Sequence, residues 1–318
     1  MRVLTELDRG RIAELLARDE FFWLDLQSPS SEALRHLKDM LNLHPVAVEA
    51  LAEPHQRPRL DPYENYVVLV FYGVGGDQRG QLDPIEVRMV ISGSYIVTVH
   101  GESCEHLDRL RDHFERGVQG GEAFVVYKVL DALADSFFPA LAAVDEEIDE
   151  VEDAIVSHAD ERQLQRIFEL KRELVGLRRI ATPQRDLLAR TIDEINELPG
   201  FEDDTRNYFR AVYDHMIRVS DLIDSYRDLL TSALDVYLST VSNRLNSVME
   251  RLTIVATIFL PLSVLTGFFG MNFGWMVRHI SSFADFAIFG IGGIVLFVVV
   301  LLAIFWRAGY LGNRAAPG

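Results

Sequence analysis

The sequence has a single cysteine, Cys104, so the chain can form no internal disulfide bond. Scarce cysteine agrees with folding in a reducing cytoplasm. The first residues, MRVLTELDRGRIAELL, lack the apolar core of a signal peptide. We therefore expect the bulk of the chain to stay on the side of the membrane where it is made.

Basic residues are scarce relative to acidic ones: 31 Lys and Arg against 48 Asp and Glu give a net charge of −17 over 318 residues. A nucleic-acid-binding surface needs clustered Lys and Arg, so we expect no nucleic-acid partner. An acidic balance is compatible with cations as partners.

Enzyme motifs are also lacking. There is no G-x-S-x-G sequence, and Gly73–Gly76 lacks the lysine and helix of a phosphate-binding loop, so we expect a turn between strands there. The spacing of His100, Cys104, His106 and His113 fits no standard zinc pattern. We expect a protein that is not an enzyme.

Charge is absent from two long stretches near the C-terminus, 252–269 and 286–306. Each has the roughly 18–20 apolar residues that a helix needs to cross a membrane. Arg244 and Arg251 precede the first stretch and Arg307 follows the second, whereas the loop between them has only Arg278. This excess predicts a multi-pass protein of the cell (inner) membrane with both termini in the cytoplasm.

Residues 1–120 show mixed α/β patterns. The expected elements are an apolar run at 21–26, helices at 31–41 and 45–53, a strand at 66–72, a hairpin at 85–91 and 95–99, and a helix at 100–117 ended by glycine.

Long helical patterns follow, over 124–157 and 160–194, and predict antiparallel neighbours. The acidic run at 145–153 on the first is either a solvated face or a collector of cations. After a break at Leu198-Pro199-Gly200, one helix is expected to continue to Gly270.

Apolar residues of this last helix alternate in steps of 3 and 4, which predicts a heptad seam. It comprises Phe209, Val212, Met216, Val219, Ile223, Tyr226, Leu230, Ala233 and Tyr237. The seam needs a partner, either the preceding helix pair or copies of the same helix.

Small and polar residues form a stripe on the first apolar stretch, opposite Ile254, Ile258 and Leu262. The stripe comprises Asn246, Met249, Leu252, Ala256, Leu260, Ser263, Gly267 and Gly270. It is either a close-packing face or the wall of a water-filled path. Two spans cannot enclose a path, so a channel requires a symmetric ring of subunits.

Asn272 follows directly after the first stretch. Helix C-terminal carbonyls carry partial negative charge, and a ring of neutral amide oxygens suits hydrated Mg²⁺, which gives up water reluctantly. Met249 and Leu252 would form apolar rings that close the path by dewetting.

Gly270-Met271-Asn272 at this place resembles the signature of the CorA family of two-span divalent-cation channels. The stretches VYLSTVSNRLNSVMERLTIVATIFLPLSVLTGFFGMNF and QRPRLDPYENYVVLVFY are similar to it too, and the resemblance covers most of the chain. It implies an α+β cytoplasmic domain, a long helical stalk and two transmembrane helices in a pentameric funnel. It implies transport of Mg²⁺ and often Co²⁺ or Ni²⁺, with Zn²⁺ in some relatives.

The resemblance also implies residue roles. Gly270, Met271 and Asn272 would form the outer filter. Leu260, Ser263 and Gly267 would line the upper pore, Asn246, Met249 and Leu252 the lower pore and gate, and Asp235 a deeper acidic ring. The expected segments are a cytoplasmic α/β domain (1–120), a helix pair (121–198), a stalk (199–251), a first span (252–271), an extracytoplasmic loop (272–285), a second span (286–306) and a cytoplasmic tail (307–318).

Two features depart from the family pattern. The outer loop contains Arg278 and no early acid, and Ala211 stands where relatives have a metal-sensing carboxylate. Asp77 and Asp214 are the candidate regulatory metal ligands in its place. The alternatives are a proton-coupled Zn²⁺ transporter of the same architecture and a membrane-anchored coiled-coil scaffold in which the stripe is only packing.

Overall fold

The computed structural model describes residues 2–76, 82–116, 121–198, 201, 206–271, 274–279 and 282–307. The chain divides into two compact units, Met1–Tyr237 and Leu238–Gly318. Each unit is described by itself.

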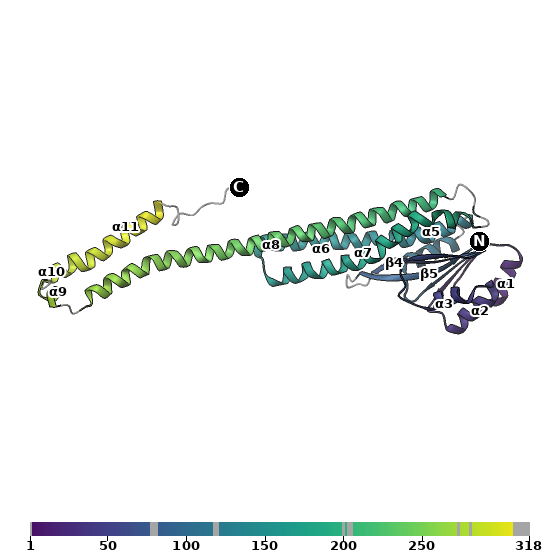
Figure 1. Ribbon diagram of the computed structural model, residues 1–318, viewed down its shortest axis with the longest axis horizontal. Helices are drawn as coiled ribbons and strands as arrows, with labels where there is room; N and C mark the ends of the chain where they lie inside the picture. Colours follow the sequence, from purple (N-terminus) through teal and green to yellow (C-terminus); the bar gives the residue numbers. More distant parts are fainter. Residues whose placement is uncertain are drawn as a thin grey trace. The chain divides into compact units, whose positions relative to one another are not determined.

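The first unit contains a six-stranded mixed sheet with the order β1-β2-β6-β5-β4-β3 (Figure 1). The strands are β1 (Arg2–Leu4), β2 (Phe22–Gln27), β3 (Arg59–Pro62), β4 (Val67–Gly76), β5 (Leu82–Ile91) and β6 (Tyr95–His100). β1, β2 and β6 run parallel to one another, and the remaining neighbours are antiparallel. The predicted hairpin is the β5–β6 pair, with Ile91 opposite Ile96.

Both faces of the sheet are buried. Successive strand residues point to opposite sides, so neighbouring residues of one strand enter different cores. Phe22, Leu24 and Leu26 pack with α1 (Arg9–Ala17), α2 (Ser31–Leu41) and α3 (Pro45–Ala52) in one core. Trp23, between them, belongs to a second core with α4 (Glu105–Glu115) and α5 (Glu122–Asp135). The sheet therefore lies between two helical layers.

The two short helices α2 and α3 form where the sequence predicts them, and local features mark their ends. The Ser30 side chain accepts a hydrogen bond from the Ala33 N–H at 3.1 Å at the start of α2, and Asn42 ends it in the left-handed conformation. Pro45 occupies the first turn of α3, where its missing N–H costs nothing.

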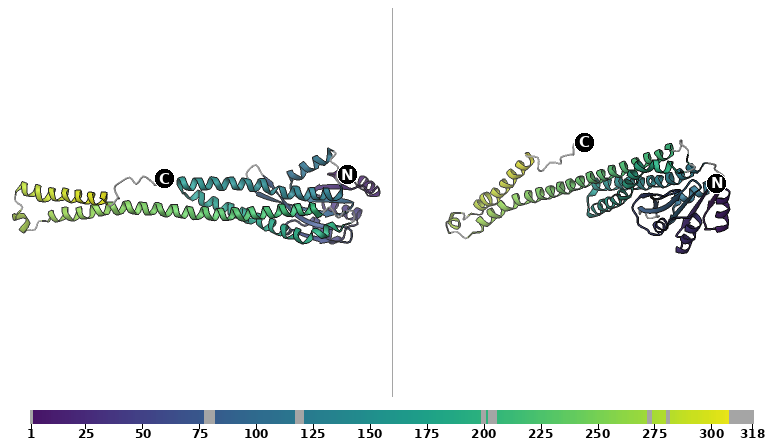
Figure 2. Two further views of the ribbon diagram at one scale, coloured as in Figure 1. Left: turned by 90° about the horizontal axis from the view of Figure 1, so that it is seen from above. Right: turned by 45° about the vertical axis from the view of Figure 1, so that its right-hand side comes forward.

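Three long helices share the second core of this unit (Figure 2), and two of them, α6 (Phe137–His158) and α7 (Glu161–Asn196), contact the sheet. α6 and α7 form the predicted antiparallel pair. Asp160 begins α7 with a capping box, in which its backbone N–H donates to Gln163 Oε1 at 2.8 Å. α8 (Arg206–Phe269) is a single helix of 64 residues and belongs to both units.

The heptad seam of α8 is covered within the chain. Phe209, Val212, Met216, Val219, Ile223, Leu230 and Ala233 are almost fully buried in one core with α6 and α7. The preceding helix pair is thus the partner of the seam. This is the first of the two alternatives that the sequence left open, and the seam therefore gives no separate support for a ring of α8 copies.

Other expectations were wrong in detail. The helix predicted over 124–157 is interrupted at Ser136, whose hydroxyl donates to the Leu133 carbonyl (2.5 Å) and accepts from the Val74 N–H (2.7 Å). Gly73–Gly76 is not a turn, because it continues β4 opposite Leu82–Ile85 of β5. The helix predicted at 100–117 begins at Glu105, since His100 still pairs with β2, and its expected closing glycine lies outside the described residues.

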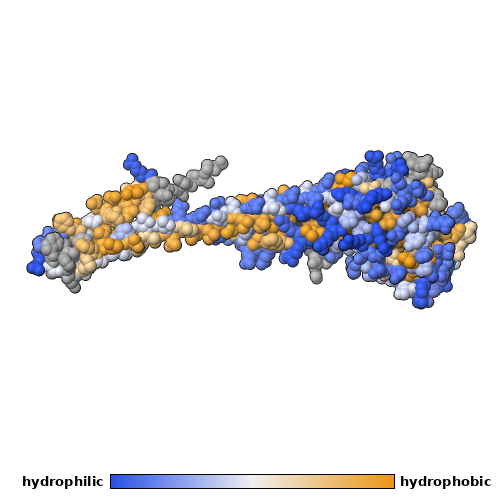
Figure 3. Space-filling model, in the orientation of Figure 1, coloured by the Kyte–Doolittle hydropathy of each residue, from blue (hydrophilic) through white to orange (hydrophobic). Residues whose placement is uncertain are grey.

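The second unit holds the end of α8, α9 (Gly274–His279), α10 (Phe283–Asp285), the π-helical segment η2 (Phe286–Gly292) and α11 (Gly293–Arg307). Among the described residues, two helices are long and apolar enough to cross a membrane, one within 206–268 and one at 283–307. Hydrophobic residues cover the surface of both in Figure 3. The two uncharged stretches therefore form helices, as predicted.

Candidate ion path and metal centre

The residues of the predicted pore stripe lie at the surface of α8. All eight residues from Asn246 to Gly270 are exposed in the single chain, with Met249, Leu252 and Leu260 between 65% and 72% exposed. Ile254, Ile258 and Leu262 are half-buried, and α11 lies alongside this part of α8 (Figures 1 and 2). The stripe is thus more exposed than the side of α8 that carries these three residues.

Exposure alone does not separate a water-facing wall from a lipid-facing one. Phe259 and Val264, outside the stripe, are exposed as well, at 65% each. What distinguishes the stripe is its chemistry: an amide, a hydroxyl and two glycines recur on one side of the helix. Adding a Cβ at Gly267 would meet no atom of the chain, so this side has free space beside it.

Hydroxyl groups along the span are satisfied by the helix itself. Ser263 donates to the Phe259 carbonyl at 2.9 Å, and Thr257 donates to the Thr253 carbonyl at 2.7 Å. Such bonds remove the cost of a free donor in a membrane and leave hydroxyl lone pairs available. α8 continues through Pro261, so the proline does not end it.

The helix ends where the predicted filter begins. The Gly270 N–H donates to the Thr266 carbonyl at 2.9 Å, and the Met271 N–H donates to the Phe268 carbonyl at 3.3 Å. A Cβ on Gly270 would lie only 3.2 Å from the Thr266 oxygen, so glycine permits this close final turn. Met271 is 52% exposed, and Asn272 lies outside the described residues.

Of the two predicted regulatory ligands, the structure describes only Asp214. Asp214 is exposed on α8, and Asp77 lies outside the described residues. Asp235, the predicted deeper ring, is also exposed on α8. The neighbour of Asp214, His215, takes part in a different cluster that the sequence reasoning missed.

This cluster joins two helices. Asp131 and Asp135, one turn apart on α5, face His215 on α8, and one ligand atom from each lies within 4.8 Å of the others. His215 Nδ1 is 3.3 Å from Asp131 Oδ1 and 3.0 Å from Asp135 Oδ1. Asp131 is only 7% exposed, and its other oxygen pairs with Lys128 Nζ at 3.0 Å.

Two polar atoms of the cluster are buried without a hydrogen bond: Asp131 Oδ1 and His215 Nδ1. Buried polar atoms normally have partners. Burial first, and then the Asp131 carboxylate, raise the pKa of Asp135 against the opposing effect of His215. A bound divalent cation would be coordinated by the two buried atoms that make no hydrogen bond. It would also neutralise the negative charge of the two neighbouring carboxylates.

Little in the sequence marks this cluster. His215 lies 80 positions beyond Asp135 along the chain, and only the four-residue spacing of Asp131 and Asp135 is a local signal. Two carboxylates and an imidazole suit Mg²⁺ through oxygen, and Co²⁺, Ni²⁺ or Zn²⁺ through oxygen and nitrogen.

A mixed sheet between helical layers is followed by a 64-residue helix, whose end is one of two helices long and apolar enough to cross a membrane. The chain belongs to the CorA family: residues 18–307 match the family described as CorA-like Mg²⁺ transporter protein. The resemblance carried by the Gly-Met-Asn signature is thereby confirmed.

Individual relatives agree with this assignment. The chain is 31% identical to the cobalt/magnesium transport protein CorA of Thermotoga maritima, over 85% of this chain and 78% of that protein. It is 23% identical to the zinc transport protein ZntB of Yersinia pseudotuberculosis, over 89% and 85%. The fold matches the complete structure of the CorA magnesium transporter from Methanocaldococcus jannaschii with a TM-score of 0.79, 23% identity and 91% coverage of both chains.

Proposed function

We propose that this protein is a homopentameric channel for divalent cations, with Mg²⁺ as the main ion and Co²⁺ and Ni²⁺ as further substrates. The observation that carries the proposal is the small and polar stripe from Asn246 to Gly270, exposed on α8 opposite its half-buried side. One chain offers a single pore wall, so several copies must stand around an axis to enclose a path. Membership of a transporter family favours this function over a scaffold.

The filter of this channel is the ring of Gly270, Met271 and Asn272. Backbone carbonyls at the end of α8 and neutral amide oxygens attract a cation without stripping its water. Below it, the stripe offers hydroxyl and amide groups, and Met249 and Leu252 close the path when it dewets. Asp235 adds a ring of negative charge deeper in the path.

The protein lies in the cell membrane with both termini in the cytoplasm, as the distribution of Arg residues favours. Inward movement of a divalent cation is then driven by the membrane potential, which contributes roughly 4–5 kcal/mol per 100 mV for two charges.

The Asp131–Asp135–His215 cluster is the cytoplasmic metal site of this channel. It joins α5 to α8, the helix that further along lines the path. Occupancy of the cluster by the transported ion would change the free energy of the α5–α8 contact, so internal cation could regulate the pore.

One observation favours Zn²⁺ as a second candidate substrate. His215 supplies an imidazole nitrogen, a ligand that zinc prefers over magnesium, and one relative is named a zinc transport protein. In this alternative the same architecture carries Zn²⁺ and couples it to protons.

Transport by the purified protein in liposomes tests both candidates. We expect influx of Mg²⁺, Co²⁺ and Ni²⁺ without a pH gradient, and loss of influx in Asn272→Ala with unchanged oligomer size. Zn²⁺ influx that requires a pH gradient would favour the second candidate. Unchanged Mg²⁺ influx in Asn272→Ala would show that the filter assignment is wrong.

A further inference from the structure

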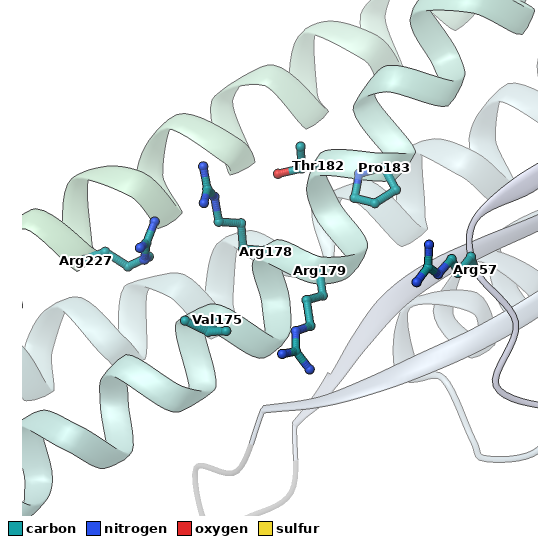
Figure 4. A pocket seen from close by; sticks show the side chains of 7 residues that line it. All are labelled: Arg57, Val175, Arg178, Arg179, Thr182, Pro183 and Arg227. Carbon is teal, nitrogen blue, oxygen red and sulfur yellow. The ribbon is translucent and has the colours of Figure 1, made fainter.

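Four arginines line one hollow of the first unit, although the chain as a whole is strongly acidic. Arg57, Arg178, Arg179 and Arg227, with Val175, Thr182 and Pro183, surround a hollow of about 940 Å³ (Figure 4). No carboxylate lines it within the described part of the chain. A volume of this size matches that of small-molecule sites.

The arginines come from three separate elements, so the fold assembles the charge. Arg178 and Arg179 belong to α7, Arg227 to α8, and Arg57 to the segment between α3 and β3. That segment is fixed by Gln56, whose side chain donates to the Ala50 carbonyl at 2.6 Å and whose own carbonyl accepts from the Tyr72 hydroxyl at 2.5 Å.

Only part of this positive charge is compensated. Asp224 Oδ1 lies 3.0 Å from Arg178 Nε and 3.1 Å from Arg227 Nη1, so one carboxylate serves two guanidinium groups. Among the described residues, Arg57 and Arg179 have no carboxylate at ion-pairing distance. Three uncompensated positive charges therefore face the hollow.

We propose that this hollow binds an oligophosphate anion. Guanidinium groups match phosphate oxygens with paired, charge-assisted hydrogen bonds, and arginines on three elements can hold several phosphoryl groups where one could not contact them all. Val175, 40% exposed, and Pro183 add an apolar wall against which a nucleoside could rest.

Binding of sodium tripolyphosphate to the full-length, detergent-solubilised protein tests the proposal by calorimetry in metal-free, low-salt buffer. We expect saturable binding that weakens with added salt. Arg57→Gln and Arg179→Gln should each lower the affinity about tenfold, the loss expected for one charge-assisted contact. Arg190→Gln is the matched control, because Arg190 is exposed on the same helix and does not line the hollow.

Asp224→Asn is expected to change the affinity for tripolyphosphate in the opposite direction. It releases Arg178 and Arg227 from their shared carboxylate, so the affinity should rise severalfold, a gain that damage to the fold would not produce.

ATP and AMP are further probes: tighter binding of ATP than of tripolyphosphate identifies a nucleotide, and equal binding identifies the phosphate chain alone. AMP, with one phosphate, should bind more weakly than both.

Absence of saturable binding, or equal losses in Arg179→Gln and Arg190→Gln, would overturn the proposal. A second result would also overturn it: the wild type binds no tripolyphosphate, and the double variant Arg57→Gln/Arg179→Gln changes its oligomer size. The hollow would then be a contact between copies of the chain. The assay needs no transport, so its failure leaves the channel proposal untouched.

Discussion

His215 Nδ1 on α8 lies 3.0 Å from Asp135 Oδ1 on α5, and Asp131 completes the cluster from the next turn. This contact ties the helix that continues toward the predicted pore to the helical layer on the sheet. Asp131 Oδ1 and His215 Nδ1 lie at ion-pairing distance, but both are buried without a hydrogen bond. A cation with oxygen and nitrogen ligands would coordinate both atoms.

The first prediction concerns this cluster. Saturating Mg²⁺ or Co²⁺ should raise the thermal stability of the wild type, by about 2.7 kcal/mol at one hundred times the dissociation constant. His215→Gln and Asp131→Asn should lose most of this gain. Asp214→Asn, next to His215 but exposed, is the control and should keep it. An equal loss in Asp214→Asn would favour the ligand predicted from the sequence instead.

The second prediction concerns the seam of α8. Ile223 is fully buried against α6 and α7, so Ile223→Ala should destabilise the chain by about 2–5 kcal/mol. Oligomer size should not change, because the seam is covered within each chain. Ser225→Ala, at an exposed position two residues on, should have little effect. Chemical denaturation and light scattering measure the two quantities, and dissociation of Ile223→Ala would place the seam between subunits.

Long-range periodicity explains what the sequence could predict. The two apolar stretches, the α6–α7 pair and the length of α8 all follow from patterns that extend over many turns. The helix starts at Ser31 and Glu161 are stabilised locally, because the Ser30 and Asp160 side chains accept hydrogen bonds from backbone N–H groups within three residues. These features depend on neighbours in sequence.

Features that depend on distant neighbours were missed. Gly73–Gly76 forms a strand because β5 supplies its hydrogen bonds, which overrides the turn preference of glycine. Ser136 interrupts a helix because Val74 in the sheet donates to its hydroxyl. Asp131, Asp135 and His215 meet only because α5 and α8 lie together in the fold, and the sequence shows no more than the four-residue spacing of the two aspartates.

A buried polar network joins the sheet to α4. His100 Nε2 lies 3.0 Å from Asp25 Oδ1, and Arg111 Nη1 lies 2.7 Å from the other oxygen. Burial acts to lower the pKa of His100, but the Asp25 carboxylate outweighs it, and the pKa is raised above 6.5. Burial acts to raise the pKa of Asp25, but His100, Thr98 and Arg111 outweigh it, and the pKa is lowered below 3.8.

The third prediction follows from these signs. The contribution of His100 is complete below its ordinary pKa of 6.5 and is lost as pH rises through its raised value. The contribution of Asp25 is present above pH 3.8 and is lost as pH falls through its lowered value. Unfolding free energy should therefore decline from about pH 6.5 upward. His100→Gln should lower the unfolding free energy by about 1–3 kcal/mol at pH 6 and flatten this decline. His113→Gln, at an exposed position, should do neither. If the decline is equally steep in His100→Gln, other groups cause it.

The fourth prediction distinguishes a pore wall from a packing face. Ser263 and Val264 are neighbours at one depth of α8, both exposed in the single chain, and their side chains point about 100° apart around the helix. If the stripe faces water, a cysteine at Ser263 ionises and reacts with a charged thiol reagent, whereas one at Val264 stays in an apolar surrounding and does not.

The chain suits this measurement because its single cysteine, Cys104, is fully buried. Ser263→Cys and Val264→Cys are made in a Cys104→Ala background and labelled in liposomes during cation flux. Modification of Ser263→Cys should block influx, since the label then fills the path, and Mg²⁺ at high concentration should slow the labelling by occupying the same space. Unreactive Ser263→Cys, with or without labelling of Val264→Cys, would mean that the stripe packs against another helix and that the ions take a different path. Equal reactivity at both positions would mean that the stripe is not the side of α8 that faces water.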